Sequence, residues 1–166
     1  MSEPIQPVFT IDKLYVKDLS LEIPNAPQIF LEREQPKVDL QIQNAATQIS
    51  DGVFEASLTA TVTAKIGEKT MFLIEATQAG IFQIRNLGKE DMDMVLGVGC
   101  PNILYPYLRE VVSDCATRAG FMPVVLAPMN FEALYVQRMQ QQQQQQQQAQ
   151  VTAPAGNARA RSPASR

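Results

Sequence analysis

The sequence contains no histidine in its 166 residues. Histidine is the commonest general base and the commonest metal ligand, and Ser-His-Asp and Cys-His catalytic sites require it. Cysteine is scarce as well: Cys100 and Cys115 are the two in the chain, and their spacing does not form the CxxC unit of a zinc site or a redox dithiol. These absences argue against enzymes of those classes, and we expect neither a cofactor nor a metal site.

Long apolar runs and phosphate-binding loops are also missing. No stretch approaches the roughly 18 apolar residues of a membrane-spanning helix, and residues 1–10 (MSEPIQPVFT) lack the apolar core of a secretory signal. We therefore expect a cytoplasmic protein without direct membrane insertion. Residues 67–70 (GEKT) lack the Gly-Lys-Ser/Thr order of a phosphate loop, so an ATP-driven activity is not expected.

Acidic and basic residues are unevenly distributed along the chain. All 17 Asp and Glu residues precede Gln140, whereas three of the 14 Lys and Arg residues, Arg159, Arg161 and Arg166, lie in the last 18 residues. An acidic body disfavours nucleic acid as a partner, because neutralising phosphates needs clustered basic side chains. It suits a basic partner instead.

The first half of the chain carries β-strand patterns. Residues 37–43 alternate apolar and polar side chains, which is typical of a half-buried strand. Residues 57–64 and 70–76 are predicted to be two further strands, joined as a hairpin by the turn at residues 66–69. Residues 71–74 are apolar on both faces, so we expect both faces to be covered, by the chain's own helices or by another subunit.

Residues 9–23 form the first candidate strand, but its apolar pattern changes parity. A bulge or twist near Leu14 would explain the change. Beyond it, Asp18, Ser20 and Glu22 share one face, with the two carboxylates about 13 Å apart at roughly 3.3 Å per residue. That distance is too long for a shared proton or for a glycosidase pair. The stripe is either a solvated strand face or an acidic docking surface, and the pattern leaves both open.

Residues 24–36 contain three prolines, which argues against a helix or a central strand there. Ile29, Phe30 and Leu31 nevertheless form an apolar triplet inside this predicted loop. Either the triplet covers the core, or the loop forms a wall of an apolar groove. The sequence pattern is compatible with both.

After Gly88 the apolar period becomes helical. Pro101 suits the first turn of a helix, Gly120 suits its end, and Pro106 predicts a distortion in between. The predicted buried stripe of this helix consists of Leu104, Tyr107, Leu108, Val111, Val112, Cys115 and Ala119.

The two cysteines have different predicted environments. Cys115 belongs to the buried stripe and is expected to act as a small apolar side chain. Cys100 precedes Pro101 at the predicted helix start, and a helix N-terminus can lower the pKa of a thiol and make it reactive. Because no histidine is available as a base, we interpret Cys100 as structural.

A last helix is predicted to begin at the N-cap residue Asn130. It passes into nine consecutive glutamines, residues 140–148, which are fair helix formers. Residues 149–166 are rich in Ala, Pro, Arg and Ser and are predicted to be disordered. The expected organisation is a domain of residues 1–139, a polyglutamine helix extension of residues 140–148 and a tail of residues 149–166.

Three segments carry a resemblance to a known family: residues 17–27 (KDLSLEIPNAP), 100–110 (CPNILYPYLRE) and 126–135 (LAPMNFEALY). They closely resemble the signature segments of SecB, the bacterial protein-export chaperone family, and the similarity extends from about Phe9 to Met139. The resemblance implies an α+β fold with a four-stranded antiparallel sheet and helices packed on one face. It also implies a homotetramer, a dimer of dimers, in which the long helix that starts near Pro101 lies between sheets.

The resemblance further implies two binding surfaces. In the family, the loop after the first strand and the last helix flank a long groove for extended, unfolded segments of client proteins. Carried over to this chain, the client-binding residues are Ile29, Phe30, Leu31, Val38, Leu40, Ile42, Tyr135 and Met139. The SecA motor docks on an acidic sheet face, matched here by Asp18, Glu22, Leu73 and Glu75. Zinc in that contact belongs to SecA's own basic C-terminal segment, so this chain needs no zinc ligands.

The function implied by the resemblance is that of an ATP-independent holdase and not of an enzyme. Such a chaperone binds unfolded precursor proteins, keeps them competent for translocation and delivers them to SecA for export. An alternative is a SecB-like chaperone of a toxin–antitoxin system, which a neighbouring toxin operon would favour. An enzyme on an α+β scaffold is disfavoured by the absence of histidine and of a nucleotide loop.

Overall fold

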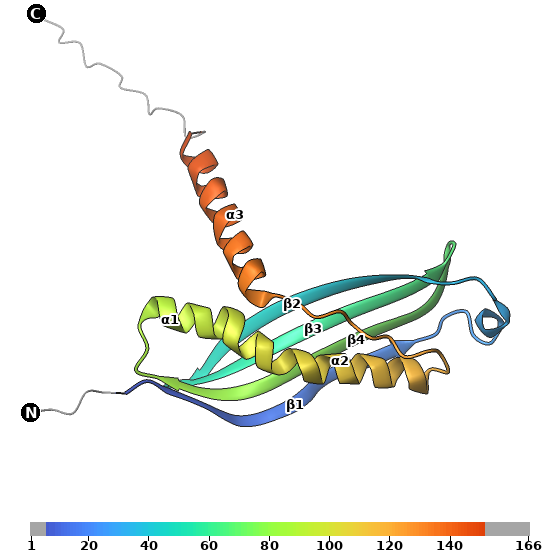
Figure 1. The fold of residues 1–166 in the computed structure, drawn as a ribbon, viewed down its shortest axis with the longest axis horizontal. Coiled ribbons are helices and arrows are strands. Elements are labelled where there is room, and N and C mark those ends of the chain that lie inside the picture. The colour runs from blue at the N-terminus through green and yellow to red at the C-terminus, as the bar shows by residue number, and fades with distance from the viewer. Residues whose placement is uncertain (1–5, 152–166) are drawn as a thin grey trace, which may run out of the picture. The chain divides into compact units, whose positions relative to one another are not determined.

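The computed structural model describes residues 6–151, with side chains described as far as residue 146. Its elements, in chain order, are β1 (Val8–Glu22), the 3-10 helix η1 (Gln28–Leu31), β2 (Lys37–Ser50), β3 (Val53–Ile66), β4 (Lys69–Arg85), α1 (Lys89–Met94), the π turn η2 (Val95–Gly99), α2 (Cys100–Arg118) and α3 (Phe131–Val151). Figure 1 shows the strands as one sheet, with α1 and α2 along one of its faces.

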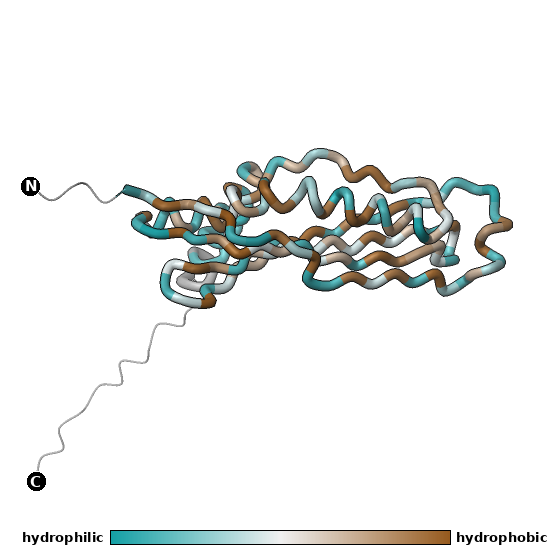
Figure 2. Tube along the Cα trace, turned by 90° about the horizontal axis from the view of Figure 1, so that it is seen from below, coloured by the Kyte–Doolittle hydropathy of each residue, from teal (hydrophilic) through white to brown (hydrophobic). Residues whose placement is uncertain are grey.

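The four strands pair antiparallel in the order β1-β4-β3-β2. This confirms the predicted antiparallel sheet and the hairpin of β3 and β4, whose turn contains Gly67 in the left-handed region at φ 57°. Apolar and polar residues alternate along the strands (Figure 2). We call the side that carries Leu58, Val62 and Ile74 the helix face, because α2 packs on it, and the opposite side the open face.

Strand β1 contains two bulges in place of the single one expected near Leu14. Its register with β4 slips at Asp12 and again at Lys17. Each bulge adds one residue and so reverses the face that the following side chains meet. Six large apolar residues of β1 therefore share the helix face: Phe9, Ile11, Leu14, Val16, Leu19 and Leu21. Val8, at the start of the strand, lies on the open face. The predicted polar stripe, Asp18, Ser20 and Glu22, lies on the open face.

The helix after β4 begins earlier than predicted. Helical backbone starts at Lys89 and continues through η2 into α2, so Pro101 lies well inside a helical run instead of at its first turn. The first turn carries Glu90 and Asp91, whose charges complement the positive end of the helix dipole. Apolar periodicity did not reveal this start, because α1 contains no buried residue.

The π turn η2 explains how a helix can pass through Pro101. Proline has no N–H, and in a regular α-helix its ring clashes with the carbonyl four residues earlier. Here the turn is wider, and the N–H of Cys100 donates to the carbonyl of Val95, five residues back. In the same five-residue pattern the carbonyl of Leu96 would accept from the N–H of residue 101, but Pro101 has none. This carbonyl accepts instead from Nδ2 of Asn44 in β2 at 3.4 Å. This contact connects the irregular turn to the sheet.

The core lies between α2 and the helix face of β3 and β4. Leu104, Leu108 and Val112 of α2 are completely buried. They lie over strands that present short side chains, which let the helix approach closely: Ala56, Ala60, Ala64 and Ala76. Tyr107 differs from its prediction as part of the buried stripe, because it is 49% exposed on a side of α2 that this chain leaves uncovered.

The segment between β1 and β2 contains one ordered turn that was not predicted. Residues Gln28–Leu31 form η1, with Pro27 as its N-cap. The prolines of residues 24–36 exclude a long helix, but a proline before a helix removes no bond, since that N–H would have no helical partner. A single short turn is therefore compatible with them.

Helix α3 begins directly after Asn130, includes the glutamine run and ends at Val151, inside the segment assigned to the tail. Residues 152–166 lie outside the described residues. Residues up to Glu132 form one compact unit and those from Ala133 onward another. Between residues 6 and 151, none of the helices has the length and apolar character needed to span a membrane.

Candidate functional site: an apolar groove and an acidic sheet face

An apolar groove of about 440 Å³ lies between the edge strand β2 and the segment that follows α2. Val38 and Leu40 contribute from the helix face of β2 and are 45% and 36% exposed. In the other wall, Met122 and Val125 are 83% and 74% exposed. The complete lining is Pro36, Val38, Leu40, Met71, Phe72, Phe121, Met122, Pro123, Val124, Val125, Leu126 and Ala127. A groove of this composition can accept apolar side chains without reading a particular sequence.

Tyr105 of α2 holds the second wall in place. Its hydroxyl donates to the carbonyl of Ala127, and its ring meets the ring of Phe131 edge-on with centroids 5.4 Å apart. Burial raises the pKa of Tyr105, so the hydroxyl remains a hydrogen-bond donor. Leu126 anchors the same segment, because its side chain is buried in the core and is 4% exposed. A wall without helix or strand is thus fixed in position, which reduces the ordering cost of binding.

Aromatic rings connect η1 to the groove. Phe30 stacks on Phe121 with centroids 5.0 Å apart, and Phe121 meets Phe72 at 5.2 Å. The residues on either side of Phe30 in the sequence differ in exposure: Ile29 is 2% exposed and Leu31 is 81% exposed. Ile29 therefore covers the core and is closed to a ligand in this structure. Phe30 lies outside the groove lining and packs against Phe121, which belongs to that lining.

Of the eight residues predicted to bind clients, Val38 and Leu40 belong to the groove lining, and Leu31 is exposed outside it. Ile42 lies on the helix face of β2, is half-buried and packs at the margin of the core. Tyr135 and Met139 belong to α3, in the compact unit that starts at Ala133. Their contact with clients stays a prediction.

The four residues matched to the acidic docking face lie together on the open face of the sheet. Asp18 and Glu22 project from β1, and Leu73 and Glu75 project from the neighbouring strand β4, with Glu22 directly opposite Leu73. Among the described residues, none of these three carboxylates takes part in an ion pair. An anionic surface around one apolar side chain is therefore available to a basic partner.

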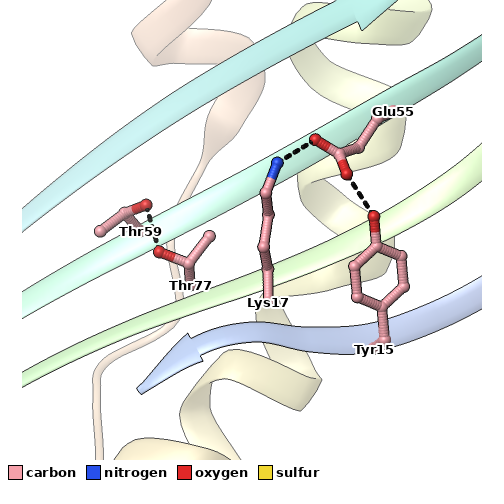
Figure 3. A network of polar contacts seen from close by, with 5 residues as sticks. All are labelled: Tyr15, Lys17, Glu55, Thr59 and Thr77. Carbon is pink, nitrogen blue, oxygen red and sulfur yellow. Dashed lines mark hydrogen bonds and ion pairs between the residues drawn. The ribbon is translucent and has the colours of Figure 1, made fainter. Parts of the chain in front are cut away.

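Next to this acidic group, three side chains form a polar network across the sheet (Figure 3). Tyr15 of β1 donates a hydrogen bond to Oε2 of Glu55 in β3, and Nζ of Lys17 lies 2.5 Å from Oε1 of the same carboxylate. Both side chains cross β4, and Tyr15 starts opposite Ala79, a small residue that is fully buried. Hydrogen bonds from Lys17 and Tyr15 lower the pKa of Glu55, and the bond to Glu55 raises the pKa of Tyr15 to about 12.

The cysteines contribute no reactive group to either surface. Both are free and buried, and burial raises the pKa of Cys100 to about 12 and also raises that of Cys115. Because helical backbone extends upstream of Cys100, this thiol does not lie at a helix N-terminus. The interpretation of Cys100 as structural agrees with its burial. No group of residues suited to hold a metal ion occurs between residues 6 and 151.

Comparison with known proteins decides the family. The family model described as preprotein translocase subunit SecB matches residues 2–142. The chain belongs to the SecB family. Membership makes it a protein-export chaperone, as the sequence resemblance implied.

Curated relatives named protein-export protein SecB are similar to this SecB-family chain over most of its length. The relative from Chromobacterium violaceum is 60% identical over 156 residues, which is 94% of this chain and 97% of the relative. That from Nitrosospira multiformis is 61% identical and covers 84% of this chain and 87% of the relative. The relative from Neisseria meningitidis serogroup A is 57% identical and covers 84% of this chain and 96% of the relative.

A solved structure supports the SecB-like fold. It is that of a Mycobacterium tuberculosis SecB-like chaperone in complex with a ChAD peptide from an antitoxin. It superposes on this chain with a TM-score of 0.62 and covers 74% of this chain and 91% of the other. Its sequence identity is 16%, so the likeness concerns the α+β fold alone.

Sequence reasoning missed two parts of the site in this SecB-family chain. The first is the groove wall of residues 121–127, and the second is the network around Glu55. Residues 121–129 (FMPVVLAPM) combine exposed apolar side chains with prolines that prevent a helix, the same combination that drew attention to residues 24–36. The network gave no signal, because Tyr15 and Glu55 are brought together only by the register of three strands.

Proposed function

We propose that this SecB-family chain is an ATP-independent holdase that captures unfolded precursor proteins in the apolar groove. The observation that supports the proposal is the row of large apolar side chains left open along Val38, Leu40 and residues 121–127. Contiguous apolar surface on a protein commonly marks a binding site. An unfolded precursor exposes apolar side chains that a folded protein hides, so this surface selects for unfolded chains.

The position of β2 adds backbone recognition to the proposal. In the order β1-β4-β3-β2, strand β2 is an edge and offers unpaired backbone groups beside the groove. An extended client segment can pair with these groups while its side chains enter the groove. Burial contributes about 25 cal/mol per Å² of apolar area, offset by the cost of ordering the client. Backbone pairing and apolar burial both tolerate sequence variation, as a general export chaperone requires.

The proposed client surface follows the groove and its surroundings. It includes Phe30, Leu31, Val38, Leu40 and Ile42 in the first compact unit. Tyr135 and Met139 of α3, in the other unit, are proposed as separate client contacts. Ile29 is left out, because its side chain is buried. We assign it the role of anchoring η1, so that Phe30 stays stacked on Phe121.

Delivery to the motor is proposed to occur on the opposite side of the sheet. Asp18, Glu22 and Glu75 give the open face three carboxylates near Leu73 that form no ion pair among the described residues. The basic, zinc-bearing C-terminal segment of SecA fits such a surface through charge complementarity. Zinc would remain with SecA. Because the groove lies on the helix face, a client and the motor can bind the same chain together.

We further propose that the working form is a homotetramer, a dimer of dimers in the cytoplasm. Strand β1 is the second edge of the sheet, and its helix-face residues Phe9, Val16 and Leu19 remain 41–47% exposed. Tyr107 of α2, in the same unit, is 49% exposed as well. Further copies that cover these residues would leave several grooves on one particle. Two segments of one client could then bind at once, which increases avidity.

Binding of a reduced, denatured precursor by variant and wild-type chains tests the groove. We expect Val38→Asp to weaken binding about tenfold, because a charge would need burial against the client. Gln41→Asp is the matched control, since it adds the same charge on the same strand but on the open face. Equal loss in both variants, or loss in neither, would contradict the proposal. Light scattering of each variant verifies that assembly is unchanged.

A toxin–antitoxin role is not proposed. The SecB-like chaperone solved with an antitoxin peptide is 16% identical to this chain. The relatives named protein-export proteins are 57–61% identical.

A further inference from the structure

The bulge at Lys17 decides which face of the sheet carries the acidic group. Before the bulge, Tyr15 lies on the open face opposite Ala79. Strict alternation from Tyr15 would put Leu19 on the open face and Asp18 on the helix face. The extra residue at Lys17 reverses this, so Asp18 lies opposite Thr77 on the open face.

Two side chains at this bulge are bound to the same carboxylate. Tyr15 precedes the bulge and Lys17 is the bulged residue, and each occupies one oxygen of Glu55 (Figure 3). Glu55 lies in β3, two strands away from β1, so the contacts cross β4 and fix the bulge against the centre of the sheet. The side chain of Lys17 is 49% exposed and that of Glu55 is 22% exposed, so the carboxylate is the better shielded partner.

The network also separates two kinds of carboxylate on the open face. Glu55 is neutralised by Lys17, whereas Asp18 is in no ion pair among the described residues. Residues 17 and 18 are neighbours in sequence, and a backbone held at Lys17 fixes where the carboxylate of Asp18 points. Glu22 follows four residues later on the same face.

We infer that Lys17, Tyr15 and Glu55 are positioning residues for the acidic docking face. They hold the β1 bulge in the register that presents Asp18 and Glu22 beside Glu75, and they do not themselves contact the basic partner. The inference rests on the proposed function of this face. Lys17 is a cation on an acidic face and would be expected to repel a basic segment. The inference instead predicts that Lys17 strengthens the binding of that segment.

The sign of the effect of removing Lys17 distinguishes positioning from summed charge. Lys17→Met makes the face more negative, so charge alone predicts tighter binding of a basic segment. Positioning predicts weaker binding, by about threefold to fivefold, because an ion pair of this exposure is worth at most about 1 kcal/mol. Lys17→Arg should restore most of the affinity, since it keeps the ion pair with Glu55.

Lys13→Met supplies the matched control. Lys13 lies on the same strand and the same face, opposite Ile81, and takes part in no ion pair among the described residues. The substitution Lys13→Met changes the charge of the face by the same amount as Lys17→Met and removes no ion pair of Glu55. Tyr15→Phe removes one hydrogen bond to Glu55 with no change in charge, and it keeps the test decisive if Lys17→Met does not fold.

The probe is the zinc-loaded C-terminal segment of SecA as a synthetic peptide, titrated into the full-length chain by calorimetry. The inference predicts weaker binding by Lys17→Met and Tyr15→Phe, restored binding by Lys17→Arg, and unchanged or tighter binding by Lys13→Met. Client affinity should be unchanged in all four. Lys17→Met binding as tightly as Lys13→Met, or Tyr15→Phe binding as tightly as wild type, overturns the inference. Failure of the wild-type chain to bind the peptide overturns the proposed docking face itself.

Discussion

Phe30 of η1 and Phe121 of the segment after α2 stack with ring centroids 5.0 Å apart. Gly120, at φ 87°, turns the chain at the end of α2, and a Cβ on it would lie 3.4 Å from the ring of Phe30. The pair therefore joins two segments that have no α-helix or strand of their own. It supports the groove wall from behind the lining, to which Phe121 belongs.

Replacing one member of this pair should weaken client capture. We expect Phe30→Ala to reduce affinity for a denatured precursor about threefold to tenfold, since a stacked pair contributes about 0.5–1.5 kcal/mol beyond area. Phe9→Ala is a matched control, because Phe9 is also stacked, on Phe82 at 5.7 Å, and is 41% exposed against 47% for Phe30. Phe9 belongs to the proposed subunit interface, so the two variants are compared at equal particle size, verified by light scattering. Equal loss in both variants would indicate a general effect and count against the groove. Fluorescence anisotropy of a labelled precursor measures both.

The sequence predicted those parts of the fold that depend on regular alternation. The hairpin of β3 and β4 and the stripe Asp18, Ser20 and Glu22 were identified because each face of a strand has its own solvent exposure. The two bulges of β1 were predicted as a single one near Leu14. The second bulge reverses the effect of the first, so the apolar residues after it return to the original alternation between the two faces. The early helix start was missed for a different reason, since α1 buries no side chain.

The candidate site was predictable to a lesser extent. Asp18, Glu22, Leu73 and Glu75 came from the family resemblance, and the strand register brings them to one face. The wall of residues 121–127 has no helix or strand and is held by the hydrogen bond from Tyr105 to Ala127. A periodic sequence pattern does not predict such a contact. Sequence reasoning fails where a tertiary contact, and not a local pattern, positions the backbone.

Reversing the charge of the open face should separate its two proposed activities. Asp18→Lys and Glu75→Lys are expected to weaken SecA binding at least tenfold, because each replaces attraction by repulsion near the basic segment. Client binding should be unaffected, since both residues lie on the face opposite the groove. Parallel titrations with SecA and with a denatured precursor measure the two affinities. A similar fall in both would show that the surfaces are not independent.

The network around Glu55 makes two predictions about pH. The pKa of Glu55 is lowered below its usual 4.5, so its stabilising effect is complete above pH 4.5 and is lost as pH falls through the lowered value. The pKa of Tyr15 is raised from 10.0 to about 12, so its effect is complete below pH 10.0 and is lost as pH rises toward 12. Tyrosinate absorbance of wild type minus Tyr15→Phe reports the second titration. Glu55→Gln should return it toward 10.0, and a wild-type midpoint near 10.0 would contradict the hydrogen bond.

Assembly should depend on the exposed apolar row of β1. Leu19 is 46% exposed on the helix face, and Leu19→Asp is expected to yield smaller particles in light scattering, because a buried unpaired charge is costly. Ser20→Asp adds the same charge one residue later, on the open face, and should leave the particle size unchanged. A tetramer that persists in Leu19→Asp would remove this row from the proposed interface.

The central claim is that the groove holds unfolded chains without turnover, and the refolding of a slow-folding denatured precursor tests it most directly. The folded yield is followed by fluorescence while the chain is added in increasing ratio, without nucleotide. We predict that the yield falls in proportion to the chain added and levels off once every precursor is bound, and that Val38→Asp shifts this titration to higher ratios. Refolding that proceeds unchanged at excess chain, or arrest by traces far below stoichiometry, would contradict the claim.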